Sequence, residues 1–262
     1  MPQALRASHC EWRQGRGLRH IDPMRWLLPT GLAVAALLVG FGVIRSGGRV
    51  SPEMTPPPVS GERVAVDSDG AIAARALIRR RIAESDTYLG YSLSESDSVL
   101  KRWRDRITTP LAVYFSPAEV PGYSDALGAA VRDAFTRWER VGAVPVVFQI
   151  ERDSARADVL VRWIESFPIR RTGQADVVWD HEGWIVGATL TLATHVSEGR
   201  MVTPEIAYTV ALHEIGHLLG LGHSDDPDDL MYPSTSVHDL TPRDRRTARL
   251  LYALPPGSVR EH

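Results

Sequence analysis

The sequence predicts an α/β (α+β) domain whose mixed, five-stranded sheet is backed by three helices. Two observations support this prediction. Short runs rich in β-branched and apolar residues are separated by turn residues, and three longer segments have helical features. In chain order the segments give strand, helix, four strands, helix, helix. That order favours a single layered unit.

The five expected strands are short, and turn residues lie between them. We expect them at Pro110–Phe115, Val144–Ile150, Asp158–Ile164, Gln174–Asp180 and Trp184–Ala193. Residues 180–183 join the last two. No internal repeat is visible.

The helices of the domain are expected at Tyr123–Arg140, Pro204–Leu219 and Pro242–Leu254. In the first of these segments, apolar residues recur at helical spacing. The second has Thr203 as N-cap with proline at the first helical position, and Gly220 ends it as a left-handed residue. A further helix is expected at Ala71–Ser85, whereas residues 88–106 give no clear assignment.

Composition limits the classes of protein to consider. The chain has 262 residues with a formal net charge of -2, so no overall positive field indicates a nucleic-acid partner. Cys10 is the only cysteine, which excludes an internal disulfide and a cysteine-rich structural zinc site. Any metal must therefore be bound by His, Asp or Glu.

Residues 26–44, WLLPTGLAVAALLVGFGVI, are uncharged and bracketed by arginines. About 19 helical residues approach the thickness of a bilayer core. The arginines before this run place residues 1–25 in the cytoplasm and the later residues outside it. We expect a single-pass signal anchor. The alternative is a secreted protein after signal cleavage, although residues 40–42 make a poor cleavage site.

Three further divisions follow from the pattern. Residues 45–106 form a linker, rich in Pro, Gly and Ser near its start, and an N-terminal helical segment. Residues 107–254 form the α/β domain, and residues 255–262 form a C-terminal tail.

The stretch HEIGHLLGLGHS, residues 213–224, indicates a metal site. His213 and His217 lie one helical turn apart, so both imidazoles can reach one ion. The bend at Gly220 lets His223 fold back as a third ligand. Glu214 lies beside them, where a general base can reach a metal-bound water. Three histidines suit zinc best without excluding other metals, and they leave a coordination position open.

This stretch, followed by DDLMYP at residues 228–233, resembles the matrixins, the metzincin branch that contains the matrix metalloproteinases. The short gap from His223 to Met231 fits the Met-turn of that branch. The resemblance covers residues 110–254, so residues 107–254 would form a matrixin-like catalytic domain. The predominance of arginine over lysine suggests a bacterial member, and residues 26–44 predict that it is membrane-anchored.

The resemblance implies a zinc endopeptidase. His213, His217 and His223 would bind catalytic zinc, Glu214 would carry the proton, and Met231 would support the site from beneath without binding the metal. Tyr232, Pro233 and Ser234 would line the pocket for the residue after the scissile bond. The strand Trp184–Ala193 would be the edge along which a protein or peptide substrate lies extended.

The chain departs from the animal enzymes in several ways. Their propeptide cysteine has no equivalent here, so latency would need another device, such as residues 71–106. Their second zinc would have only His181 and His195, without the His-x-Asp spacing. An acidic run near residue 226 allows Ca²⁺, although a solvated loop is the favoured interpretation.

Two other functions stay open. One is a zinc hydrolase or peptidase of narrow specificity, and the other is a catalytically silent binding module. Degenerate metalloproteases should lose the glutamate or a ligand first, and this sequence retains both.

Overall fold

The computed structural model describes residues 66–141, 144–196 and 199–260. The predicted cytoplasmic tail, the anchor at 26–44 and most of the linker lie outside these residues. Among the helices that are described, none is both long enough and apolar enough to cross a membrane.

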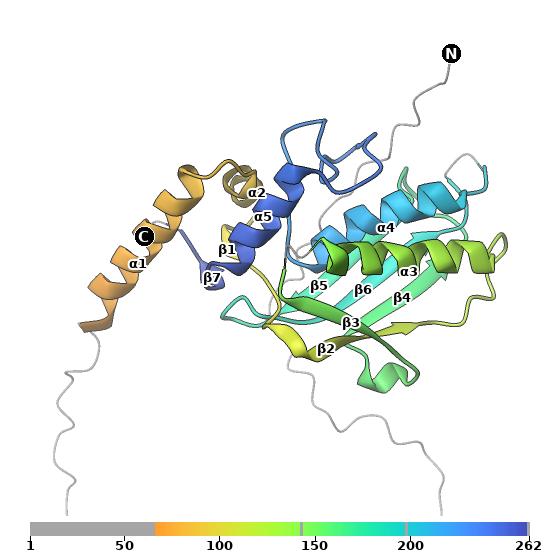
Figure 1. Ribbon diagram of the computed structural model, residues 1–262, viewed down its shortest axis with the longest axis horizontal. Coiled ribbons are helices and arrows are strands. Elements are labelled where there is room, and N and C mark those ends of the chain that lie inside the picture. The colour runs from red at the N-terminus through yellow and green to blue at the C-terminus, as the bar shows by residue number, and fades with distance from the viewer. Residues whose placement is uncertain (1–65, 142–143, 197–198, 261–262) are drawn as a thin grey trace, which may run out of the picture.

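A mixed five-stranded sheet forms the centre of the molecule (Figure 1), as the sequence predicted. Its order is β3-β2-β4-β6-β5. Strands β2, β3, β4 and β6 run parallel, and β5 pairs antiparallel with β6. The strands are β2 (Arg106–Phe115), β3 (Val146–Glu151), β4 (Val159–Ile164), β5 (Gly173–Trp179) and β6 (Ile185–Ala193).

The prediction that Trp184–Ala193 forms the edge of the sheet is wrong. Strand β6 pairs with β4 on one side and with β5 on the other, so it is an inner strand. Most of its residues are buried, as expected for a strand covered on both edges. The free edge at this end of the sheet belongs to β5, because the hairpin returns the earlier strand to the outside.

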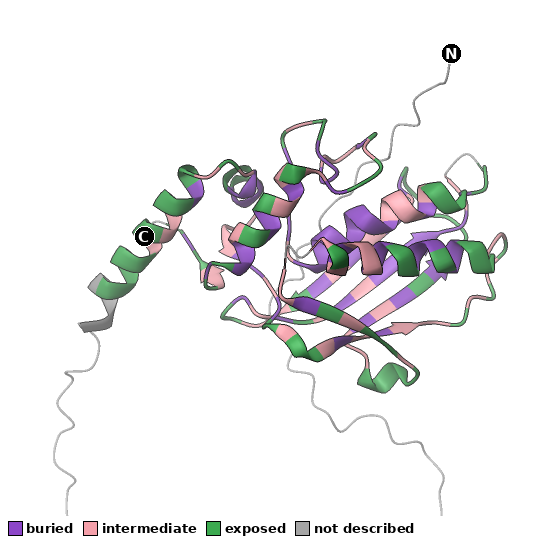
Figure 2. Ribbon diagram, in the orientation of Figure 1, coloured by how far each residue is buried: buried purple, intermediate pink, exposed green. Residues whose placement is uncertain are grey.

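Two long helices, α3 (Asp125–Arg140) and α4 (Pro204–Leu218), cover one face of the sheet. The outer face of α3 is exposed, whereas α4 is exposed only at its start and is buried throughout from Ala211 to Leu218 (Figure 2). The indole N–H of Trp138 on α3 donates to the carbonyl of Leu212 on α4 at 3.0 Å, which fixes the two helices against each other. A third helix, α5 (Pro242–Tyr252), begins with the capping box of Thr241 and Asp244.

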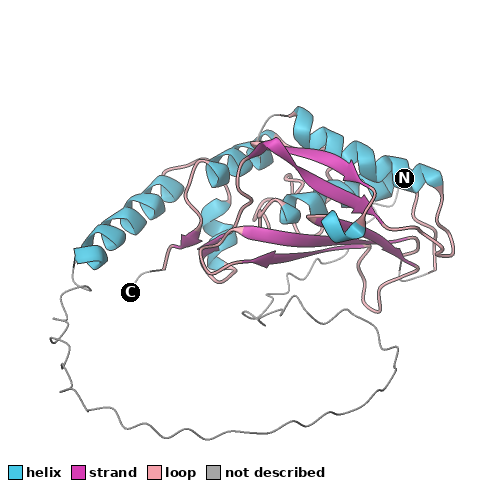
Figure 3. Cartoon of the chain, turned by 90° about the horizontal axis from the view of Figure 1, so that it is seen from below, coloured by secondary structure: helices cyan, strands magenta, loops and turns pink. Residues whose placement is uncertain are grey.

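The segment before the sheet is more structured than the sequence indicated. Helix α1 (Val66–Ala83) projects from one end of the molecule (Figures 1 and 3), and its exposed residues are shown in Figure 2. It confirms the expected helix near Ala71–Ser85. The short helix α2 (Leu89–Ser94) and strand β1 (Val99–Leu100) follow, and β1 pairs with β7 (Gly257–Ser258). A 3₁₀ turn (Ser154–Arg156) precedes β4.

Candidate metal centre

Helix α4 carries the centre, and its ends are those that the sequence predicted. The hydroxyl of Thr203 accepts from the backbone N–H of Ile206 at 3.4 Å, and Pro204 occupies the first turn. Gly220 has a φ of 100°, the left-handed conformation that ends the helix. The helix therefore stops at a defined point, and the chain turns back toward it.

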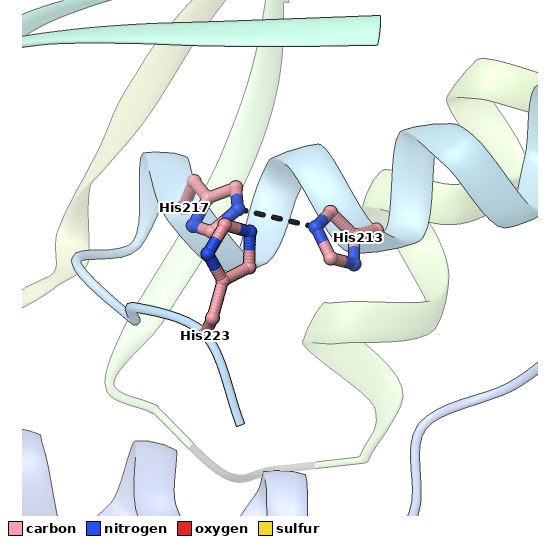
Figure 4. A group of neighbouring side chains, drawn as sticks. All are labelled: His213, His217 and His223. Carbon is pink, nitrogen blue, oxygen red and sulfur yellow. Dashed lines mark hydrogen bonds between the residues drawn. The ribbon is translucent and has the colours of Figure 1, made fainter. Parts of the chain in front are cut away.

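The three predicted histidine ligands converge. His213 and His217 project from the same face of α4, and His223 comes from the chain after the bend (Figure 4). One ring nitrogen from each lies within 4.8 Å of the others. Of the residues that the structure describes, these three form the only such group of three or more His, Cys, Asp or Glu side chains.

Backbone carbonyls set the tautomers of two of these rings. The Nδ1 of His213 lies 2.8 Å from the carbonyl oxygen of Leu230, and that of His217 lies 2.8 Å from the carbonyl oxygen of Leu221. Because a carbonyl only accepts, both Nδ1 atoms carry the proton, which leaves a lone pair on each Nε2 of the neutral rings. The two Nε2 atoms face each other at 3.2 Å. Facing lone pairs repel unless a cation lies against both, so the donor set fits zinc.

Burial keeps these rings in the form that binds metal. It lowers the pKa of His213 below its ordinary value and that of His217 well below it. The neighbouring His223 and His213 lower the pKa of His217 further. Neutral imidazole, the ligand form, is thus favoured at neutral pH.

Glu214 is buried beside the histidines, against the edge strand. Gly173, the first residue of β5, makes room for it. A Cβ added at Gly173 would lie 2.8 Å from Cγ and 2.9 Å from Oε1 of Glu214. The glycine therefore allows the glutamate and the free edge of β5 to approach each other closely.

Met231, whose role as a support beneath the metal stays a prediction, lies in the loop between His223 and α5. It is fully buried, and a Cβ added at Gly216 on α4 would collide with its Sδ. Asp244 holds this turn by accepting from the backbone N–H groups of Leu230 at 3.1 Å and Met231 at 3.3 Å. The carbonyl of Leu230 accepts a hydrogen bond from His213. The peptide group between Leu230 and Met231 therefore links the carboxylate of Asp244 to the ring of His213.

The bend before His223 packs against the N-terminal segment. A Cβ at Gly220 would collide with the carbonyl oxygen of Lys101, and one at Gly222 with the hydroxyl of Ser92. Sequence reasoning did not find this contact or the role of Gly173. Both depend on partners far away in the chain.

The remaining predicted residues lie around the centre. Tyr232, Pro233 and Ser234 follow Met231 and are half-buried, and their role as a pocket wall stays a prediction. His181 is exposed in the turn between β5 and β6, and the Nδ1 of His195 lies 3.0 Å from the hydroxyl of Thr194.

The acidic loop after His223 binds an arginine of its own chain. Asp225 and Asp229 lie 2.9 and 2.8 Å from the guanidinium of Arg243, and Asp229 also accepts from the hydroxyl of Ser224. These two carboxylates are thus part of an ion-pair network. A Ca²⁺ ion on this loop stays a prediction.

Comparison with known proteins gives a consistent set of matches. Residues 103–253 match the family described as Matrixin. Metalloendoproteinase 1 of Glycine max is 29% identical over 182 residues, which cover 60% of this chain and 54% of that protein. Matrix metalloproteinase-15 of Homo sapiens is 27% identical over 268 residues, covering 91% of this chain and 36% of that protein.

A shorter match is closer in sequence. Matrilysin of Felis catus is 50% identical over 48 residues, which cover 16% of this chain and 18% of that protein. The chain spans 54% of the Glycine max relative and 36% of the human one.

Proposed function

This chain belongs to the matrixin family, and from that premise we propose that it is a zinc-dependent endopeptidase acting on extracytoplasmic proteins. The observation that supports it most directly is the pair of Nε2 lone pairs held 3.2 Å apart beside Glu214. The names of the relatives agree, since one is a metalloendoproteinase and the other a matrix metalloproteinase.

Each group in the centre has a role in peptide hydrolysis. Zinc, bound by His213, His217 and His223, would supply a Lewis acid that polarises the peptide carbonyl and makes water a stronger acid. Glu214 accepts a proton from the attacking water as the new C–O bond forms. It then passes a proton to the departing amine nitrogen as the C–N bond breaks, so water is divided between the two products.

The substrate would lie along β5 rather than β6. An extended peptide can add its backbone hydrogen bonds to the free edge of β5, whose first residue packs against Glu214. This arrangement brings the scissile bond next to the proton carrier. Tyr232, Pro233 and Ser234 would then line the pocket for the following residue.

The test uses the full chain in detergent. We expect about one zinc per chain by elemental analysis, and cleavage of an unfolded protein that a chelator abolishes. Glu214→Gln should keep the zinc and reduce kcat/KM by roughly 10²–10⁴-fold, the typical contribution of a general base. Glu205→Gln, an exposed change on the same helix, is the matched control.

Zinc binding with no cleavage of any protein, and no difference between Glu214→Gln and the parent, would favour a silent binding module. A folded chain without zinc would refute the proposal entirely.

We further propose that residues 26–44 anchor the chain with its catalytic domain outside the cytoplasm. The support is the apolar run with arginines on its N-terminal side. Cys10, the only thiol, provides the test. In intact cells a membrane-impermeant maleimide should leave Cys10 unlabelled, whereas added protease should remove the catalytic domain. Release of the domain into the medium would instead support the signal-peptide alternative.

A further inference from the structure

A cavity of about 400 Å³ lies beside the metal centre. We call it the α2 cavity. One wall comes from the centre itself and includes His217, Gly222, His223 and Pro233. The opposite wall comes from α2 and the chain after it, and includes Leu93, Glu95, Ser96 and Lys101.

The second wall comes from the N-terminal segment, before the family match. The match to the matrixin family begins at residue 103, whereas the wall is formed by residues 89–101. One wall of the cavity, with the charges of Glu95 and Lys101, therefore comes from residues that the family match does not include.

The wall is part of the folded domain rather than a loosely placed cover. Leu89 and Leu100 are almost fully buried, and the indole N–H of Trp103 donates to the carbonyl of Leu218 at 2.8 Å. Ser92 and Lys101 close the base of the cavity by packing on Gly222 and Gly220. The residues that form this wall are thus packed into the domain.

Its position suits a side chain of a bound peptide. Two of the three metal ligands line it, so whatever fills it lies next to the reacting bond. An extended peptide advances about 3.3 Å per residue, and side chains one to three residues from the scissile bond lie within about 10 Å of it. Because His217 and His223 line the α2 cavity, a side chain at one of these positions can enter it.

The charges around the cavity favour a cation. The positive charge of Lys101 is balanced within the chain, because its Nζ lies 2.9 Å from a carboxylate oxygen of Asp97 and 4.0 Å from the centroid of the Trp179 ring. Glu95 is exposed at the rim, and no ion-pair partner for it exists in the described part of the chain. Leu93, Leu100 and Leu221 supply apolar surface deeper in the cavity.

We propose that the α2 cavity is a specificity subsite that takes a lysine or arginine side chain of the substrate. The aliphatic stem packs on the leucines, and the cationic end meets Glu95 at the rim. This inference rests on the proposed endopeptidase activity, and it names the substrate class.

The experiment compares two matched pairs of variants in the full chain. Ser96→Phe fills the cavity, whereas Ser94→Phe adds the same ring to an exposed position of α2 outside the lining. Glu95→Gln removes the rim charge, whereas Glu182→Gln removes an exposed charge elsewhere. Cleavage is measured on a peptide library and on peptides that carry either arginine or norleucine at the preferred position.

We expect the parent to prefer arginine and lysine at one position near the cleaved bond. Ser96→Phe should abolish that preference, and Glu95→Gln should reduce the arginine-over-norleucine ratio about fivefold, the scale of a partly exposed ion pair. Neither control should change the profile. A library profile unaffected by Ser96→Phe, or a parent preference for apolar residues that Glu95→Gln leaves unaltered, would overturn the proposal.

A binding measurement separates this inference from the proposed function. An arginine-containing peptide labelled with a fluorophore is titrated onto Glu214→Gln, with and without Ser96→Phe. Weaker binding in the doubly substituted chain supports the subsite even if no cleavage is ever found. Equal binding, in a chain that does cleave proteins, refutes the subsite and leaves the endopeptidase proposal intact.

Discussion

Histidines occupy two kinds of position in this molecule, and only one kind converges. His213 and His217 are buried on one face of α4, and their rings are oriented by backbone carbonyls. His181 and His195 lie at opposite ends of β6, the first exposed and the second half-buried. Histidines alone are therefore not enough for a metal centre. It also needs a frame, here the buried helix and the backbone carbonyls, that orients the rings and keeps them neutral.

The largest expected effect comes from removing a ligand. His217→Ala should abolish zinc binding, with a loss in affinity beyond the roughly 10–100-fold that loss of an outer hydrogen bond costs. His195→Ala, the matched change in the other group, should keep the zinc. Elemental analysis of both purified chains measures this. Loss of zinc in His195→Ala would mean that the two groups are not functionally distinct.

Disturbing the frame next to Glu214 should have the second largest effect. In Gly173→Ala the added methyl would push against Val210 and the glutamate side chain, while all three ligands stay in place. A displacement of about 1 Å can cost roughly 100-fold in rate, so kcat/KM should fall by up to that factor with zinc retained.

Gly187→Ala on β6 is the control for that substitution, since the nearest atom to its added Cβ is 4.0 Å away. Equal activity in the two variants would show that the close packing at Gly173 does not position the glutamate.

A substitution of Asp244 tests the backbone segment that orients His213. Its carboxylate accepts from the backbone N–H groups of Leu230, Met231 and Thr241, and Asp244→Asn would turn an amide NH₂ toward some of these donors. We expect a loss of about 2–3 kcal/mol in the free energy of unfolding, with weaker zinc binding through Leu230 and His213. Urea denaturation and zinc competition measure the two effects.

Asp239→Asn provides the comparison, because that carboxylate is half-exposed and pairs with Arg137 at 2.7 Å. Its expected cost is below about 1 kcal/mol. If Asp239→Asn were the more damaging of the two, Asp244 would have no special part in the frame.

The local sequence predicts much of this frame. The ends of α4, the three converging histidines and Glu214 all depend on residues within one or two helical turns, so local spacing indicated them. The five strands were found for the same reason, since alternation and turn residues are local signals.

The sequence did not predict the contacts between segments that lie far apart in the chain. The order of strands in the sheet is set by pairing across the chain, which is why the edge was assigned to β6 instead of β5. Residues 88–106 showed no clear periodicity, because their burial is decided by partners more than 100 residues away, such as Thr247 for Tyr88 and Leu218 for Trp103. No local pattern encodes such partners.

The stability of the metal-free protein should depend on pH through His213 and His217. The pKa values of His213 and His217 are lower in the folded chain than the ordinary value of 6.5. Their contribution to stability is therefore complete above pH 6.5 and is lost as the pH falls below it, by up to about 1.4 kcal/mol per pH unit for each group. Removing both rings, in His213→Gln/His217→Gln, should flatten this part of the profile. An unchanged slope would contradict the assignment.

The smallest expected effect links the N-terminal segment to the frame. The hydroxyl of Tyr88, buried before α2, donates to Asp244 at 3.1 Å, and burial together with that carboxylate raises its pKa well above the ordinary range, so it stays a donor. Tyr88→Phe should cost about 1–2 kcal/mol, because the buried carboxylate loses one of its partners. Tyr91→Phe, on the exposed side of α2, should cost almost nothing. Thermal unfolding of the two variants decides the matter: equal melting temperatures would mean that residues before the family match pack on the frame without supporting it.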